Sequence, residues 1–282
     1  MYYLLLTLSV LLFGVGFLCN DRYTKIAGSE AVPTVMFLIF SNLAGVIVML
    51  VINRFRVEFT LFTLMSAALA SLNAILYTFF TLKSLTHINL SLYSVFAMLG
   101  GMMLPFLAGL IFYHEALTLG KGVCVILIIA ALALTVKRDG QRGGTVYYIG
   151  VFVCNGMSGV LTKLFLEAPY EKTSAESYSI WIALITLAAA LCALPFLRRK
   201  LQKPDIKAVL WSTGCGAAGR IGNYLLVLAL AVLPASVQYP FVTGGTIIVS
   251  TLLGYAVGQR PSRRELLAVA LSFVGVLLLS LI

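Results

Sequence analysis

Residues 90–112 read LSLYSVFAMLGGMMLPFLAGLIF, a run of 23 residues without a charged side chain. A helix needs about 20 predominantly apolar residues to cross the hydrocarbon core of a bilayer, so this run is long enough to span it. A strand of a membrane barrel would alternate apolar and polar residues, and this run does not. A helix is then the structure that satisfies every backbone hydrogen bond in lipid. The run therefore predicts a membrane-spanning helix.

Runs of the same kind fill most of the chain on both sides of this one. Short charged breaks separate them, such as the Arg198-Arg199-Lys200 triplet. We expect ten spans, near residues 2–20, 33–53, 59–82, 90–112, 117–136, 145–166, 177–197, 206–231, 235–257 and 265–282.

The composition excludes a soluble protein. Apolar residues make up 61% of the 282 residues and charged residues 11%, whereas a soluble domain has about 25% charged residues. Ten spans use about 200 residues, which leaves no room for a soluble domain. The net charge of +10 is scattered between the apolar runs, as in loops near anionic headgroups, and forms no stripe typical of nucleic-acid binding. We expect an all-α, multi-pass integral membrane protein in contact with the lipid bilayer and with no nucleic acid.

The chain repeats itself at an offset of 145 residues. The matched pairs follow one another in order along two apolar runs: Ser91 and Ser236, Phe96 and Phe241, Gly100 and Gly245, Leu107 and Leu252, Gly109 and Gly254. The repeat predicts two halves, 1–139 and 140–282, of five spans each. An odd number of spans places the second half upside down relative to the first, which is an inverted repeat of the kind found in many secondary transporters.

Two short motifs carry a family resemblance. His114-Glu115-Ala-Leu-Thr follows the fourth expected span, and Gly258-Gln259-Arg-Pro-Ser follows the ninth. With the serines, tyrosines and glycines that precede them, they resemble the signature of EamA-type transporters, the ten-span branch of the drug/metabolite transporter (DMT) superfamily. The resemblance implies five-plus-five inverted five-helix repeats, a central cavity lined by spans 3, 4, 6, 8 and 9, and cytoplasmic termini. Gln259 departs from the signature, which has glutamate at that place.

The lysines and arginines give a different orientation from the one that the resemblance implies. Loops after odd-numbered spans hold more of them than loops after even-numbered spans, and the positive-inside rule would therefore place both termini outside. Within the first half the two sets are equal. We adopt the family orientation, which places the linker at 139–143 and the loop at 198–203 outside the cell.

The pattern of acidic and histidine residues does not indicate an enzyme. All ten acidic residues are expected in loops or at helix ends, so no pair of carboxylates would meet inside the membrane. His114-Glu115 does not continue to the zinc motif HExxH. The five cysteines lie in or near apolar runs and are expected to be buried as small apolar residues. We expect no catalytic residue, no metal site and no cofactor.

Polar residues inside spans are the candidate substrate-binding residues, because each is costly in lipid and usually faces a cavity or a partner. Arg220, Asn223 and Tyr224 lie at i, i+3 and i+4 and therefore on one helix face. Arg220 suits a carboxylate, which arginine can bind in a two-pronged geometry. A structural tie to backbone carbonyls is the alternative for Arg220. The other candidates could equally form interhelical hydrogen bonds of about 0.6 kcal/mol each: Asn73, Tyr77, Tyr93, Ser94, Asn155, Ser158, Gln238 and Tyr239.

Two glycine pairs, Gly100-Gly101 and Gly244-Gly245, lie at matched places in the spans 90–112 and 235–257. Paired glycines permit either close helix packing or a bend. Pro105 and Pro240 lie nearby and favour the bend. We expect Gly100, Gly101, Gly244 and Gly245 to act as hinges, with simple packing as the alternative.

Together these features predict a secondary transporter of the bacterial plasma (inner) membrane that works by alternating access. The expected substrate is a small molecule, an amino acid or a related metabolite, and the expected direction is export. Efflux of hydrophobic cations is a second interpretation, with an aromatic box from Tyr77, Tyr93, Trp181, Tyr224 and Tyr239. A scaffold or receptor without flux is a third. The chain is expected to act as a monomer or homodimer.

Overall fold

The structure, a computed structural model, describes residues 2–112, 144–197, 203–230 and 235–281, together with 126, 127 and 130. Within these residues the chain is helical and contains no strand. The helices are α1 (Tyr2–Ala27), α2 (Ala31–Ile52), α3 (Leu61–Leu85), α4 (Leu90–Phe112), α6 (Thr145–Glu167), α7 (Ala175–Leu197), α8 (Ile206–Leu230), α9 (Ala235–Ala256) and α10 (Arg263–Leu281). The fifth expected span, 117–136, lies outside the described residues except for 126, 127 and 130.

Five of the described helices, α1, α2, α3, α6 and α7, are long and apolar enough to cross a membrane. Large apolar side chains point outward from them, for example Leu4, Ile47 and Leu69 at 70%, 55% and 55% exposure. Exposed leucine and isoleucine at this density fit a surface that faces lipid rather than water. The expectation of an all-helical, multi-pass membrane protein is therefore confirmed for this part of the chain, while ten spans remain a prediction.

Helix α1 is longer than the sequence indicates. We expected its span to end at residue 20, with Asp21 in the following loop, but the helix continues to Ala27. It ends at Gly28, whose φ of +83° is the left-handed conformation that glycine adopts after a helix. Asp21 is consequently a helical residue with only 1% of its surface exposed. The expectation that every acidic residue lies in a loop or at a helix end was wrong for Asp21.

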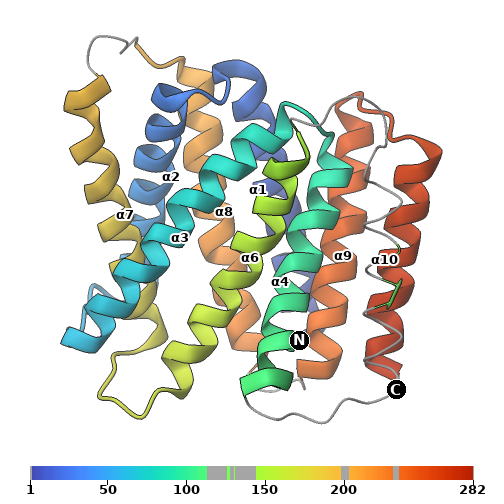
Figure 1. Ribbon diagram of the computed structural model, residues 1–282. Helices are drawn as coiled ribbons and strands as arrows, with labels where there is room; N and C mark the ends of the chain where they lie inside the picture. The colour runs from blue at the N-terminus through green and yellow to red at the C-terminus, as the bar shows by residue number, and fades with distance from the viewer. Residues whose placement is uncertain are drawn as a thin grey trace.

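The helices of the first half pack against those of the second half in a symmetric pattern. Helix α1 packs against α8 and α9, and α6 packs against α3 and α4. Likewise α2 packs against α8, and α7 packs against α3. Exchanging each helix with the helix five numbers away turns each of these pairings into another one. Figure 1 also shows that α1 ends, and α6 begins, at the same end of the bundle, so the two helices run in opposite directions.

Glycines bring pairs of helix backbones into direct contact. A Cβ atom built on Gly100 of α4 would lie 2.1 Å from the carbonyl oxygen of Phe152 in α6, and one on Gly156 would lie 2.5 Å from the carbonyl oxygen of Gly100. Likewise, a Cβ atom built on Gly216 of α8 would lie 2.0 Å from the carbonyl oxygen of Ser41 in α2. Small residues of this kind let helices approach closely in membranes. Helix α4 is continuous through Gly100, Gly101 and Pro105.

Candidate functional site

A cavity of about 390 Å³ lies between α1, α2, α3, α6, α7 and α8. Its lining comes mainly from the C-terminal half of α3, the N-terminal half of α2 and the middle of α8. These segments place the cavity nearer the end of the bundle where α1 ends and α8 begins, which is the upper end in Figure 1. The described lining residues are Asn20, Phe37, Leu38, Ser41, Asn42, Ala74, Tyr77, Thr78, Thr81, Asn155, Thr186, Cys215, Gly216, Gly219, Arg220 and Asn223.

Arg220 contributes the one charged side chain among these lining residues. Its guanidinium Nη1 donates a hydrogen bond to the Ser179 hydroxyl of α7 at 2.5 Å. The side chain also lies against Gly45 of α2, where an added Cβ would be 3.2 Å from Arg220 Nε. A guanidinium has five N–H donors, and Ser179 is the acceptor that the described residues supply. Donors therefore remain for a ligand.

The other polar groups of the cavity are neutral. Asn20, Asn42, Asn155 and Asn223 supply amides, and the threonines together with Tyr77 supply hydroxyl groups. No carboxylate belongs to the described lining. An arginine inside the helix bundle without an acidic partner favours an anionic ligand, because a carboxylate would supply the missing negative charge and accept two of the N–H bonds. This arrangement suits a small solute with one acid group and further polar atoms.

The structure brings four of the predicted site residues together at this cavity: Arg220, Asn223, Tyr77 and Asn155. Asn155 also donates a hydrogen bond to the Ala97 carbonyl of α4 at 2.6 Å, so it both lines the cavity and joins two helices. Tyr224, one residue beyond Asn223, is absent from the described lining. Of the three residues that the i, i+3 and i+4 spacing places on one helix face, Arg220 and Asn223 therefore line the cavity and Tyr224 does not.

Four further candidates are absent from the described lining and make hydrogen bonds between or within helices. Asn73 of α3 donates to the Cys154 carbonyl at 3.0 Å and to the Ser158 hydroxyl at 2.8 Å, which ties α3 to α6. The buried Tyr93 hydroxyl lies 3.0 Å from the Tyr77 hydroxyl, and this hydrogen bond holds the Tyr77 side chain in place. Ser94 donates to the Ser91 carbonyl within α4. The side chains of Gln238 and Tyr239 lie outside the described part of the chain.

Several lining residues were missed in the sequence analysis. Asn42 and Thr78 are polar residues inside apolar spans, which is the signal that marked Asn73 and Asn155. Cys215 was expected to be a buried small apolar residue, but it lines the cavity, and its thiol donates to the Asn20 side chain at 3.1 Å. Cys192 was expected to be buried as well and is exposed. Ser179 carried no signal, because a single serine in the first turns of a helix is common.

The aromatic box for a hydrophobic cation is not assembled among the described side chains. Tyr77 lines the cavity, with Tyr93 bonded behind it. Trp181 instead donates its indole N–H to the Glu58 carbonyl at 2.8 Å and packs edge-on against Phe59, outside the described lining. A cation would also meet the positive charge of Arg220.

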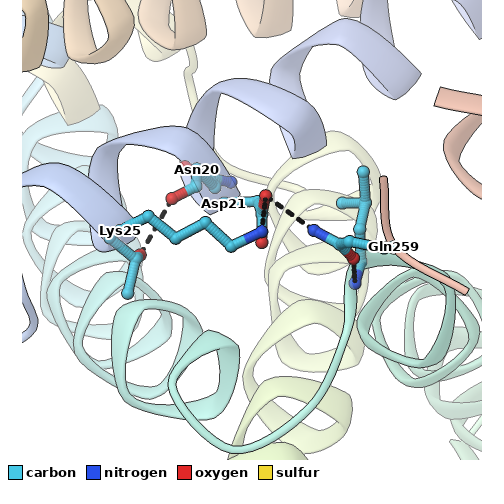
Figure 2. A network of polar contacts seen from close by, with 6 residues as sticks. Asn20, Asp21, Lys25 and Gln259 are labelled. Carbon is cyan, nitrogen blue, oxygen red and sulfur yellow. Dashed lines mark hydrogen bonds and ion pairs between the residues drawn. The ribbon is translucent and has the colours of Figure 1, made fainter. Parts of the chain in front are cut away.

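A second polar cluster lies beside the cavity and joins α1, α4 and the segment after α9 (Figure 2). The buried Asp21 carboxylate accepts from the Lys25 ammonium at 2.7 Å and from the Gln259 amide N–H at 2.9 Å. The Gln259 carbonyl oxygen accepts the backbone N–H of Leu90 at 2.9 Å. A glutamine can donate to one partner and accept from the other, whereas an ionised glutamate could only accept. Glutamine at position 259 therefore fits both of its partners in this network.

Comparisons with known proteins agree with the helical architecture. A sequence model of the EamA-like transporter family matches residues 142–281. A solved structure titled only as a crystal structure of a protein is similar over 97% of this chain and 98% of that chain, with a TM-score of 0.66 and 16% sequence identity. At that identity the likeness concerns the fold alone. No curated protein matches the chain.

Proposed function

We propose that this chain, which belongs to the EamA-like transporter family, is a secondary transporter that moves a small carboxylate-bearing metabolite across the membrane by alternating access. One observation carries the proposal: a cavity of about 390 Å³ inside the helix bundle holds Arg220 and no acidic group among its described lining. Burying an arginine in a span costs about 2.5–3.5 kcal/mol even on mild insertion scales. A carboxylate supplied by the solute offsets that cost.

The substrate that fits best is an amino acid or a related compound. Its carboxylate would bind the Arg220 guanidinium in a two-pronged geometry. The amides of Asn42, Asn155 and Asn223 would accept hydrogen bonds from an ammonium or donate them to further oxygens. The ring face of Tyr77 offers a cation–π contact to the ammonium group. The cavity volume lies within the range of about 300–1,000 Å³ that is common for small-molecule sites.

The helix packing supports a transporter built from two inverted repeats of five helices, 1–139 and 140–282. Each pairing of α1 or α2 with α8 and α9 has a counterpart between α6 or α7 and α3 and α4. Helices α1 and α6 run in opposite directions (Figure 1), as an inverted repeat requires. In this scheme the protein resides in the bacterial plasma membrane with cytoplasmic termini and exports its substrate.

Binding to purified protein tests the substrate class. A thermal-shift screen compares amino acids with their decarboxylated amines and with quaternary amines. We expect stabilisation by compounds that carry a carboxylate and none by the decarboxylated analogues, because only the carboxylate pairs with Arg220. Stabilisation by quaternary amines alone would contradict the proposal and favour cation efflux. Binding without uptake of labelled solute into proteoliposomes would favour a receptor or scaffold.

Substitution of Arg220 tests the binding residue. Hydrogen bonds to charged groups contribute about 1.5–3 kcal/mol, so Arg220→Gln should weaken binding of a confirmed substrate about tenfold to a hundredfold. Arg220→Lys should rescue little, because an ammonium lacks the planar fork of the guanidinium. Arg56→Gln, which alters an exposed arginine of the α2–α3 turn, is the matched control and should bind normally. Unchanged affinity in folded Arg220→Gln would leave Arg220 as a structural tie.

A further inference from the structure

The two halves of the chain are joined by a polar cluster at the end of the bundle where α2 ends and α7 begins. The backbone N–H of Ser174 donates to the Glu58 carboxylate at 2.7 Å. The Ser177 hydroxyl, which is fully buried, accepts from the Glu58 backbone N–H at 3.2 Å and from the Asn53 amide at 3.4 Å. The Trp181 indole donates to the Glu58 carbonyl at 2.8 Å. We call these residues, Asn53, Glu58, Ser174, Ser177 and Trp181, the clasp.

Aromatic rings of α3, α6 and α7 pack against one another next to the clasp. Phe165 of α6 stacks on Tyr178 of α7 with ring centroids 3.9 Å apart. Phe62 of α3 stacks on Phe165, with ring centroids 5.9 Å apart. Phe165 and Tyr178 are 1% and 4% exposed. The Tyr178 hydroxyl is buried without a hydrogen-bond partner among the described residues. The stacked rings therefore pack beside the clasp, at the end of the bundle away from the cavity-lining residues of α3 and α6.

The turn that carries the first half of the clasp is strained. Arg54 and Phe55 adopt φ values of 53° and 59°, the left-handed region that side chains with a Cβ avoid. Such conformations persist where the surrounding contacts hold them and are concentrated at functional sites. Here the Phe55 backbone N–H donates to the Leu50 carbonyl at 2.7 Å, and the Asn53 amide donates to the Arg56 carbonyl. Release of the clasp would let this turn relax.

Ser179 connects the clasp to the cavity. It lies on α7 between two clasp residues, Ser177 and Trp181, and it accepts the hydrogen bond from Arg220 at 2.5 Å. Ser177 contacts the α2–α3 segment, whereas Ser179 contacts Arg220, which lines the cavity. A group that competes for the Arg220 guanidinium therefore acts on the same helical turn that holds the clasp closed.

We propose that the clasp is the gate that closes the cavity on the side of the chain termini, and that Ser179 is the positioning residue through which Arg220 controls this gate. This inference rests on the proposed function, since it takes a solute carboxylate as the competing group. When the carboxylate binds Arg220, the guanidinium turns away from Ser179, the start of α7 is released, and the strained turn at Arg54 separates from α7. A ligand shifts such an equilibrium only through its different affinity for the two states, and the exchanged hydrogen bond supplies that difference.

The intrinsic fluorescence of Trp181 reports the gate directly. The chain has two tryptophans, so Trp211→Phe leaves Trp181 as the single emitter, with its indole bonded to Glu58 and its ring packed against Phe59. In this background Glu58→Ala and Ser177→Ala should shift the emission to longer wavelength and raise acrylamide quenching, because the clasp opens and water reaches the indole. Glu171→Ala, which removes an exposed carboxylate from the neighbouring α6–α7 segment, should behave like the parent. Glu58→Ala removes one exposed side chain and serves alone if Ser177→Ala fails to fold.

Cavity access provides the second readout of the clasp variants. In oriented membrane vesicles, an impermeant thiol reagent applied from the side of the α2–α3 turn should modify the native Cys215 faster in Glu58→Ala than in Glu171→Ala, as read by mass spectrometry. Equal emission and equal Cys215 modification in the two variants would overturn the gate. These measurements need no substrate, so they test the gate even if the carboxylate proposal fails.

The role of Ser179 has its own test. In the single-tryptophan protein a confirmed carboxylate substrate should shift Trp181 emission, and Ser179→Ala should show that shift without substrate and gain little more when substrate is added. Thr162→Ala, which removes an exposed helical hydroxyl of α6, is the control and should keep the full substrate response. A normal substrate response in Ser179→Ala would refute the coupling. Normal substrate affinity together with an unresponsive Trp181 in the parent protein would refute the gate and leave the binding site intact.

Discussion

The contact between α4 and α6 at Gly100 makes a quantitative prediction for Gly100→Ala. The added Cβ would lie 2.1 Å from the Phe152 carbonyl oxygen and 2.7 Å from the Phe152 carbonyl carbon and Cα. These atoms belong to a helix backbone and cannot rotate away, so the two helices must separate by about 1 Å to reach ordinary contact. Overpacking of this kind costs about 1–3 kcal/mol. We therefore expect the melting temperature to fall by about 2–12 °C.

Two other glycines calibrate the effect with the same substitution. A Cβ on Gly16 of α1 meets nothing within 4 Å, and alanine is the better helix former by about 1 kcal/mol, so Gly16→Ala should keep or raise the melting temperature. A Cβ on Gly245 meets the methyl groups of Val10 at 3.1 and 3.2 Å, a milder clash than backbone atoms at 2.1 Å, so Gly245→Ala should fall between the two. Thermal unfolding followed by size-exclusion chromatography in detergent gives the order of the three variants.

Equal melting temperatures for Gly100→Ala and Gly16→Ala would refute the packing argument. The hinge hypothesis makes a separate prediction, because a hinge affects motion more than stability. If Gly101 and Gly245 are hinges, Gly101→Leu and Gly245→Leu remain folded and slow transport in proteoliposomes. If they serve packing, both variants lose folded protein together with transport. The continuous α4 and its contact at Gly100 favour packing.

Three further predictions concern the polar network, the cavity thiol and the topology. Restoring the glutamate of the family signature with Gln259→Glu should destabilise the protein by about 1–3 kcal/mol, since two carboxylates then face each other. Adding Asp21→Asn to that variant should recover part of the loss. An unchanged melting temperature would contradict the network in Figure 2. A bound carboxylate substrate should protect Cys215, which lines the cavity, from thiol reagents, and undiminished modification at saturating substrate would place the binding site elsewhere. A cysteine introduced in the loop at 198–203 should be labelled by an impermeant reagent on intact cells, and protection there would reverse the orientation.

Charge and hydropathy along the chain were sufficient to predict the helices that the structure describes, because lipid forces every backbone polar group to pair within its own segment. The boundaries were less predictable. Polarity suggested that α1 ends before Asp21, but the helix ends only where Gly28 takes a left-handed conformation. Burial of Asp21 became possible because Lys25 on the same helix and Gln259 from the far end of the chain both donate to it.

The candidate site, too, was predicted in part from the sequence and decided in part by the tertiary structure. Helical spacing predicted that Arg220 and Asn223 share a face, since residues three apart lie one above the other on any helix. It could not predict that Ser179, distant in sequence, accepts the Arg220 hydrogen bond. Nor could it separate Asn73, which only ties α3 to α6, from Asn155, which lines the cavity as well as joining α6 to α4. A polar side chain in a span must find a partner, and both roles satisfy that demand. The sequence alone therefore determined which residues need a partner, and only the packing of the helices decided whether that partner is another helix or the contents of the cavity.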